Sequence, residues 1–197
     1  MKVLLASRNA NKLGEMRRIF GAALPDFEVV GLDDVPPYVE VPETGTTFAD
    51  NALLKAREAF AHTGLPTVAD DSGLAVEALN GMPGVLSARW SGRHGDDDAN
   101  LRLVLAQLSD TPDERLGAAF ECAVAFVSAD GERVTHGRMP GRLIREVRGT
   151  NGFGYDPIFV PDGYQVTSAE LPSDEKDEIS HRGQALRALA AELARAT

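Results

Sequence analysis

The spacing of apolar residues changes from a short run to a helical repeat near the start of the chain. Residues 3–6 are apolar, residues 7–12 form a polar stretch, and Leu13, Met16 and Phe20 then recur at helical intervals. This pattern predicts a strand, a loop and a helix. Such a loop directs backbone N–H groups and the positive end of a helix dipole to one point, which favours phosphate binding; a plain strand-to-helix connection is the alternative.

A second strand is predicted at Phe27–Gly31, and a second helix is predicted to begin after Thr47. Asp50 stands three residues after Thr47, as in a capping box, and an apolar stripe follows. Asn51 and Lys55 lie one above the other on another face of this helix, because residues four apart are neighbours there. Both side chains can therefore point into a common cleft; a solvated helix face is the alternative.

Two adjacent acids follow a buried strand before the middle of the chain. Pro66–Ala69 predicts this strand, and Asp70-Asp71-Ser72-Gly73 is predicted to end it. Ligands gather beyond the carboxyl ends of strands in α/β sheets, and acids near a core need a cation or hydrogen bonds. The segment therefore indicates a site, and a turn with helix-capping acids is the alternative.

Further elements are predicted in the second half of the chain. Apolar spacing predicts a structural helix over residues 98–108, and alternation predicts a hairpin of residues 118–127 and 132–136 around the turn 129–131. Together with the strands and helices of the first half, these elements predict an α/β fold.

A final helix is predicted after Ser180, a suitable N-cap, from the repeat of Leu186 and later leucines. His181 and Arg182 would lie in its first turn, where positive charge opposes the helix dipole. An anion or a hydrogen-bond acceptor is therefore expected beside them.

The segment 149–157 combines glycines with Phe153, Tyr155 and Asp156, which is typical of a binding loop. Aromatic faces stack on nucleobases, and glycine lets backbone approach a flat ligand closely. A hairpin loop whose aromatic residues cap the core is the alternative. Neither a dinucleotide-binding fingerprint nor a Walker loop is present in the sequence.

Composition narrows the class of protein. The 197 residues, 43% of them apolar, suit one core, so a single domain over residues 1–197, in two lobes, is expected. The net charge of −10 opposes polynucleotide binding. No apolar run approaches the roughly 20 residues of a membrane span, and residues 1–6 are too short for a signal-peptide core, so a cytoplasmic protein without membrane contact is expected.

Individual residue types add candidate chemistry. Cys122 fits a buried strand position. Only four lysines occur against sixteen arginines, so Lys12, Lys55 and Lys176 are candidates for contacts that need a point charge. The histidines are scattered, which argues against zinc, whereas oxygen ligands from Glu43, Asp70 and Asp71 favour Mg²⁺ arriving with a phosphate.

The chain resembles the inosine triphosphate pyrophosphatase family, which includes the bacterial non-canonical purine nucleoside triphosphate pyrophosphatases. Six segments carry the resemblance in order and spacing: Ser7–Lys12, Glu43–Gly45, Asn51–Lys55, Ala69–Leu74, Gly152–Pro157 and Ser180–Gly183. Each segment is weakly specific by itself, but the six together span nearly the whole chain.

This resemblance implies an elongated mixed α/β sheet with flanking helices, in two lobes around a central nucleotide cleft, in a homodimer. It also implies hydrolysis of ITP, dITP and XTP to the monophosphate and pyrophosphate, which would cleanse the nucleotide pool. The implied mechanism is attack of water at the α-phosphorus with the help of Mg²⁺.

The resemblance further implies a role for each matching residue. Asp71 would accept the proton from water and, with Glu43, bind magnesium. Hydrogen-bond donors on His181, Arg182 and the loop backbone would face the 6-oxo group of the base. The 6-amino group of adenine would leave these donors unpaired. The substrate-binding residues would be Ser7, Arg8, Asn9, Ala10, Asn11, Lys12 and Lys55 for the phosphates, Ser72, Phe153, Gly154, Tyr155 and Asp156, and Lys176, His181 and Arg182 for the nucleoside.

Three positions depart from the family's common pattern. Arg8 and Asn151 stand where relatives often have glycine, and Pro42 stands where an acid is common, which leaves Glu43 as the metal ligand. Two other functions share the motifs: a purine nucleotide sensor without turnover, and a phosphatase that releases the terminal phosphate.

Overall fold

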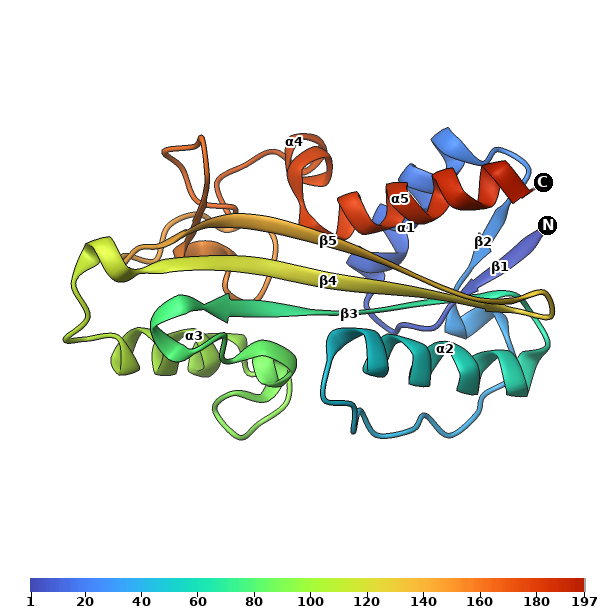
Figure 1. Cartoon of the computed structure of the whole chain (residues 1–197), viewed down its shortest axis with the longest axis horizontal. Helices are drawn as coiled ribbons and strands as arrows, with labels where there is room; N and C mark the ends of the chain where they lie inside the picture. Colours follow the sequence, from blue (N-terminus) through green and yellow to red (C-terminus); the bar gives the residue numbers. More distant parts are fainter. Residues whose placement is uncertain (197) are drawn as a thin grey trace. The chain divides into compact units, whose positions relative to one another are not determined.

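The structure, a computed structural model, describes residues 1–196, which form a mixed sheet with flanking helices (Figure 1). The strands are β1 (Lys2–Leu5), β2 (Glu28–Val30), β3 (Thr67–Val76), β4 (Gly117–Ser128), β5 (Gly131–Leu143) and β6 (Phe159–Pro161). Within the described residues the strand order is β2-β1-β3-β4-β5-β6. β1 pairs in parallel with β2 and β3, whereas β5 and β6 are antiparallel, which confirms the mixed α/β class.

The longer helices are α1 (Ala10–Ala23), α2 (Phe48–Thr63), α3 (Asp97–Gln107), α4 (Ser173–Ile179) and α5 (His181–Ala196). The chain forms two compact units, each built from separate stretches of sequence. Unit 1 comprises residues 1–71, residues 122–137 and the C-terminal stretch that begins at His181; unit 2 comprises Ser72–Glu121 and Arg138–Ser180.

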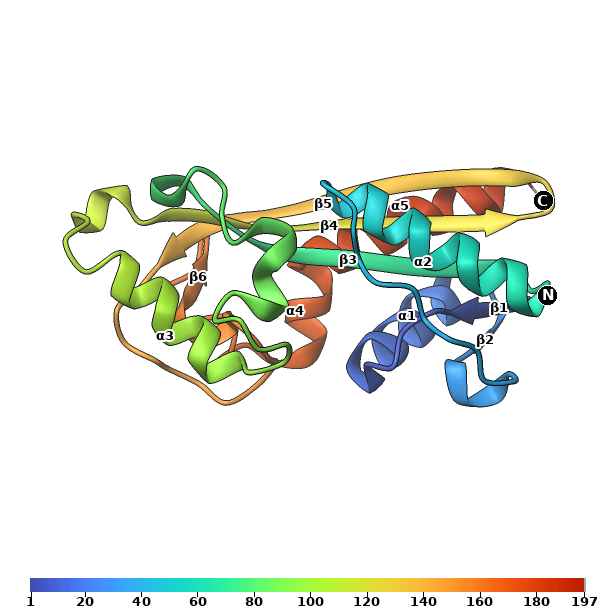
Figure 2. The same cartoon turned by 90° about the horizontal axis from the view of Figure 1, so that it is seen from below.

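Unit 1 has two hydrophobic clusters, one on each face of its strands. Alternate residues of β4 divide between them: Cys122, Val124 and Phe126 pack with α1 and α5, whereas Ala123 and Ala125 pack with α2. This follows from strand geometry, in which successive side chains point to opposite faces. Figures 1 and 2 show α2 on one face and α5 on the other. The buried position predicted for Cys122 is confirmed.

The start of α2 follows the sequence prediction. Thr47 and Asp50 form the predicted capping box, and Gly64 ends the helix in the left-handed conformation at φ 68°. The stripe that includes Ala52, Ala56 and Ala59 is fully buried, so small side chains let the helix lie close to the sheet. This close packing fixes the positions of the polar residues on the neighbouring face of α2.

Unit 2 has one large cluster, formed mainly by α3 and the strand segments of this unit. Leu101 and Val104 of α3 pack with Leu74, and Phe120 meets Phe159 edge to face with ring centroids 4.7 Å apart. The helix predicted at residues 98–108 is confirmed with a shift of one residue.

Three elements differ from the sequence prediction. β3 does not end at Asp70 but continues to Val76, because the charged side chains of the strand find partners. α4 forms in an acidic segment without an apolar repeat, so periodicity did not reveal it; its Glu and Lys residues nonetheless favour helix. The second hairpin strand runs on to Leu143, where it pairs with the short strand β6.

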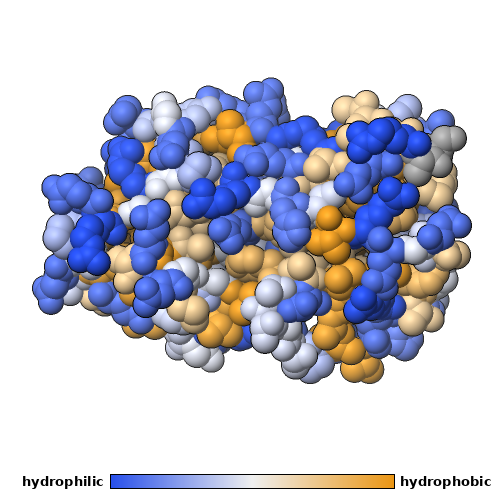
Figure 3. Space-filling model, viewed as in Figure 1, coloured by the Kyte–Doolittle hydropathy of each residue, from blue (hydrophilic) through white to orange (hydrophobic). Residues whose placement is uncertain are grey.

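The described residues contain no helix that is both long and apolar enough to cross a membrane. On the face shown in Figure 3, hydrophilic side chains surround smaller apolar groups.

Candidate functional site

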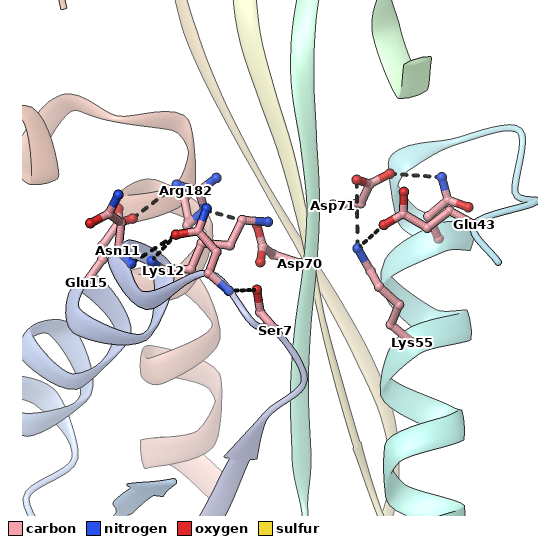
Figure 4. A network of polar contacts seen from close by, with 11 residues as sticks. Ser7, Asn11, Lys12, Glu15, Glu43, Lys55, Asp70, Asp71 and Arg182 are labelled. Atoms are coloured by element: carbon pink, nitrogen blue, oxygen red, sulfur yellow. Dashed lines mark hydrogen bonds and ion pairs between the residues drawn. The ribbon is translucent and has the colours of Figure 1, made fainter. Parts of the chain in front are cut away.

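Asp70 and Asp71 are neighbours on β3, and their side chains point to opposite faces of the sheet (Figure 4). They lie two and three residues beyond Val68, which forms with Leu5 the last pair between β3 and β1. The acids thus lie just beyond the carboxyl end of β1, although β3 itself continues. Each carboxylate has its own set of partners within unit 1.

Asp70 faces α1 and α5, where it meets two cations. Its Oδ2 lies 2.8 Å from Lys12 Nζ and accepts a hydrogen bond from Arg182 Nε at 3.0 Å. Arg182 Nη1 in turn donates to Glu15 Oε2 at 3.2 Å. The side chains of Asp70 and Arg182 are only 3% and 8% exposed. The result is a buried cluster of two acids and two cations that joins β3, α1 and α5.

These charges hold Asp70 in its ionised form. Burial would raise the pKa of the Asp70 carboxyl, but the positive charges of Lys12 and Arg182 outweigh it and hold the pKa well below its usual range. Burial likewise acts to lower the pKa of Arg182, and the negative charges of Asp70 and Glu15 raise it. Asp70 therefore acts as a counter-ion on the other face of β3 from Asp71, with which, together with Glu43, it was expected to offer oxygen ligands to a cation.

Asp71 faces α2, where Asn51 and Lys55 approach it as predicted from their spacing. Asn51 Nδ2 donates to Asp71 Oδ2 at 2.9 Å. Lys55 Nζ lies 3.9 Å from Asp71 Oδ1 and donates to Glu43 Oε1 at 2.7 Å. The two candidate metal ligands thus converge on one ammonium group, although they are far apart in sequence.

The environment of Asp71 shifts its pKa in the opposite direction from that of Asp70. Burial raises the pKa of the Asp71 carboxyl, and Glu43 adds to this effect, whereas Lys55 and the hydrogen bond from Asn51 only partly offset it. Burial would lower the pKa of Lys55, but the charges of Asp71, Asp70 and Glu43 raise it. Asp71 is therefore the more basic carboxylate of the adjacent pair.

The donor set at Glu43 and Asp71 fits a hard divalent cation. Both residues offer carboxylate oxygens and both already face a single positive charge. The described residues contain no group of three or more His, Cys, Asp or Glu side chains suited to a metal. Two carboxylates nevertheless suffice for Mg²⁺, which usually binds few protein ligands and completes its shell with water and substrate phosphates.

The loop before α1 is held by its own side chains. Asn9 caps the helix, and its side chain accepts hydrogen bonds from the backbone N–H groups of Asn11 and Lys12. The backbone N–H of Asn9 donates to Ser7 Oγ at 3.2 Å. Arg8 Nε donates to Glu40 Oε1 at 2.5 Å, so this extra cation is directed toward the segment that carries Glu43. Three of the amides that were expected to meet phosphate, those of Asn9, Asn11 and Lys12, thus have an internal acceptor.

The candidate base-binding loop lies in unit 2, where Asp156 fixes it from within. Asp156 Oδ2 accepts from the Phe153 backbone N–H at 2.9 Å and from Lys176 Nζ at 2.5 Å. Lys176 Nζ also lies 5.9 Å from the centroid of the Phe153 ring. Gly152 has φ +78°, and a Cβ there would lie 2.1 Å from Asp156 Oδ2, so only glycine suits this turn. The Phe153 side chain remains 38% exposed.

Tyr155 has a different position from that expected of a stacking residue. It is only 4% exposed, belongs to the core of unit 2, and donates from its hydroxyl to the Ser87 carbonyl at 2.8 Å. Its ring therefore supports the loop, which corresponds to the alternative that aromatic residues cap the core. Phe153 is the aromatic residue of this loop that offers a surface to a base.

Two residues that support the site were missed in the sequence. Asp97 at the start of α3 accepts from the Gly154 backbone N–H at 2.9 Å, so α3 is not purely structural. Glu15 lies beside Met16 on the buried side of α1, and an acid in that position was the available signal. Glu15 and Asp70 both bind Arg182, whose positive charge opposes the helix dipole at the start of α5. Carboxylates within the chain, rather than a ligand, therefore balance this charge.

The remaining predicted residues divide between the units. Lys176 and Ser72 belong to unit 2, whereas His181 and Arg182 belong to unit 1. His181 is buried, and the guanidinium of Arg182 is engaged by Asp70 and Glu15. In the described structure Arg182 is therefore a link between elements of unit 1.

Replacement of Asp70 by Asn should lower stability at neutral pH by about 3–5 kcal/mol, because Arg182 and Lys12 lose a buried counter-ion. The folded-state pKa of Asp70 lies below its unfolded value of about 3.9, so its contribution is present above that pH and is lost as the pH falls through the depressed pKa. Urea unfolding across pH 2–7 checks both points: the variant should lack this acid-labile component, and equal pH dependence in the two proteins would contradict the assignment.

Comparisons with known proteins identify the family of this chain. The model of the Ham1 family matches residues 3–192. A dITP/XTP pyrophosphatase of Mycobacteroides abscessus is 63% identical over 96% of this chain and 93% of its own length, and one of Nocardia farcinica is 63% identical over 98% and 95%. The Staphylococcus aureus Ham1 protein, 37% identical, superimposes with a TM-score of 0.90 over 100% of both chains. The chain therefore belongs to the Ham1 family.

Proposed function

We propose that this chain hydrolyses the non-canonical purine nucleoside triphosphates ITP, dITP and XTP to the monophosphate and pyrophosphate, with Mg²⁺ as cofactor. The observation that carries the proposal is the convergence of Glu43 and Asp71 on the single positive charge of Lys55. Relatives that are 63% identical over nearly the full chain bear the name dITP/XTP pyrophosphatase.

Asp71 is proposed to accept a proton from the attacking water. In the absence of a bound cation, burial raises the pKa of the Asp71 carboxyl, which makes it a stronger base than a carboxylate in water. The hydrogen bond from Asn51 fixes the orientation of the carboxylate at 2.9 Å, so that Oδ1 remains directed toward Lys55. Water attack at the α-phosphorus would then release pyrophosphate as the leaving group.

Glu43 and Asp71 are proposed to hold the magnesium ion. When bound, the ion would neutralise phosphate charge and polarise the phosphoryl oxygens. Lys55, already paired with both acids, is proposed to move from its carboxylate partners to a phosphate oxygen, which suits a flexible side chain with a point charge.

The other phosphate contacts are assigned to the loop before α1. Polar side chains are present there at Ser7, Asn9 and Asn11, and Lys12 adds a positive charge. Ala10 is the first residue of the helix. Arg8 is proposed to help only indirectly, because its guanidinium pairs with Glu40. The positive end of the α1 dipole favours an anion at this point.

Base recognition is assigned to Phe153 and the backbone of Gly154, with Asp156 and Lys176 as the groups that set the loop. Stacking on Phe153 accepts any purine, so selection of a 6-oxo group needs hydrogen-bond donors. We assign these donors to His181 and to backbone N–H groups of the loop other than those of Phe153 and Gly154, which already donate to Asp156 and Asp97. Ser72 is assigned as a further substrate contact. Arg182 follows His181 in α5 and pairs with Asp70 and Glu15.

The central test is product analysis with magnesium and ITP, dITP, XTP, GTP or ATP as substrate. We expect pyrophosphate and monophosphate from the first three and much slower turnover of ATP, because its 6-amino group would leave the donors without an acceptor. Release of orthophosphate would indicate a terminal phosphatase, and binding without any product would indicate a sensor.

Replacement of Asp71 by Asn should lower kcat at least about 100-fold, because the proton acceptor is lost. Binding of the nucleotide without metal should be retained, since the phosphate and base contacts remain. Asp130→Asn, the same change in an exposed turn of unit 1, serves as the matched control. Near-normal turnover by the Asp71 variant would refute its role.

Replacement of Phe153 by Ala should lower kcat/KM for ITP about 5- to 100-fold, because base stacking is worth about 1–3 kcal/mol. Phe153→Trp should retain most of the activity. Val166→Ala is the matched control, because Val166 is equally exposed in unit 2, at 38%. Equal kinetics of the Ala and Trp variants would argue against stacking.

A further inference from the structure

The buried cluster on the α1 and α5 side of β3 contains as many acidic as basic side chains. Lys12 and Arg182 are the cations, and Asp70 and Glu15 are the acids, so the four formal charges sum to zero. Asp70 contacts both cations, whereas Glu15 pairs with Arg182. Figure 4 shows the cluster on one side of β3 and Asp71 on the other.

Lys12 is the member of this cluster that meets solvent. Its side chain is 16% exposed, against 8% for Arg182 and 3% for Asp70. It also lies in the first turn of α1, next to the loop that we assign to phosphate binding. A phosphate that approaches Lys12 must therefore compete with Asp70, which is 2.8 Å from Nζ.

Asp70 is incompletely satisfied in this position. Its Oδ1 is buried and has no hydrogen-bond partner among the residues that the structure describes. Burial of a carboxylate with an unpaired oxygen is unfavourable, so a purely structural link between β3 and the helices would be better made with apolar residues. The unfavourable burial of Asp70 is explained if its negative charge acts on the Lys12 ammonium.

We propose that Asp70 competes with phosphate for the Lys12 ammonium and thereby limits the affinity of the protein for its pyrophosphate product. This inference rests on the proposed function, because it assumes that Lys12 contacts a phosphate group. Asp70 is then a positioning residue: it holds Lys12 in place when no ligand is bound, and it takes the cation back when product leaves. Asp71, on the other face, retains the chemical role.

The test compares binding of inorganic pyrophosphate, with magnesium present, by the unaltered protein and by Asp70→Asn. We expect pyrophosphate to bind about tenfold more tightly to the variant, because one charge-assisted hydrogen bond no longer competes for Lys12. A residue with a merely structural role would weaken binding when replaced. Unchanged or weaker binding by a folded variant would overturn the proposal.

Two further variants separate this effect from general electrostatics. Glu15→Gln removes one negative charge from the same cluster but leaves the pair of Lys12 and Asp70, so it should not tighten binding. Lys12→Gln combined with Asp70→Asn should lose the gain. A gain of equal size in Glu15→Gln, or one that survives the loss of Lys12, would contradict competition for this ammonium.

The outcomes also distinguish this inference from the proposed function. If the unaltered protein releases no pyrophosphate from any nucleotide, the proposed function fails, whereas a Lys12-dependent gain in Asp70→Asn would still support the competition. Normal turnover without that gain would remove only the present inference.

Should Asp70→Asn fail to fold, the carboxyl carbon of Asp70 can be followed by ¹³C NMR in the unaltered protein during a pyrophosphate titration. The proposal requires this resonance to shift at saturation, because Lys12 leaves the carboxylate. A resonance that stays in place would overturn it.

Discussion

The structure of unit 1 depends on the pairing of two adjacent carboxylates with cations from opposite faces of one strand. Asp70 and Asp71 could not both be buried on the same face, because two like charges at that distance repel strongly. Alternation along β3 separates them, and each meets its own lysine: Lys12 on the α1 side and Lys55 on the α2 side. The strand can therefore continue through two charged residues.

This separation also divides the chemistry. The charges around Asp70 hold its pKa low and keep it a permanent anion, whereas burial raises the pKa of Asp71. Pairs of acids whose environments push their pKa values apart commonly have different tasks in an active site. Here one acid serves to hold cations and the other is suited to receive a proton.

The loop of unit 2 uses the same principle on a smaller scale. Asp156 binds the backbone of Phe153 and the ammonium of Lys176, and so fixes a tight turn with one aromatic ring outward. Tyr155, two residues after Phe153, is held toward the core by the hydrogen bond from its hydroxyl to the Ser87 carbonyl. Two aromatic residues in one short segment thus have opposite positions: Tyr155 packs in the core of unit 2, whereas Phe153 is partly exposed.

The sequence by itself determined the α/β class, the capping of α2, the shared direction of Asn51 and Lys55, and the segments that carry the family resemblance. These features follow from local spacing, because side chains share a face every two residues in a strand and every three to four residues in a helix. Only the tertiary structure decided that Asp70 and Asp71 face apart, that Arg182 is a buried link and that Tyr155 belongs to the core. The bond between Arg182 and Asp70 joins residues 112 positions apart, and no local period contains such a contact. Charge balance and packing, which depend on the whole set of neighbours, selected it.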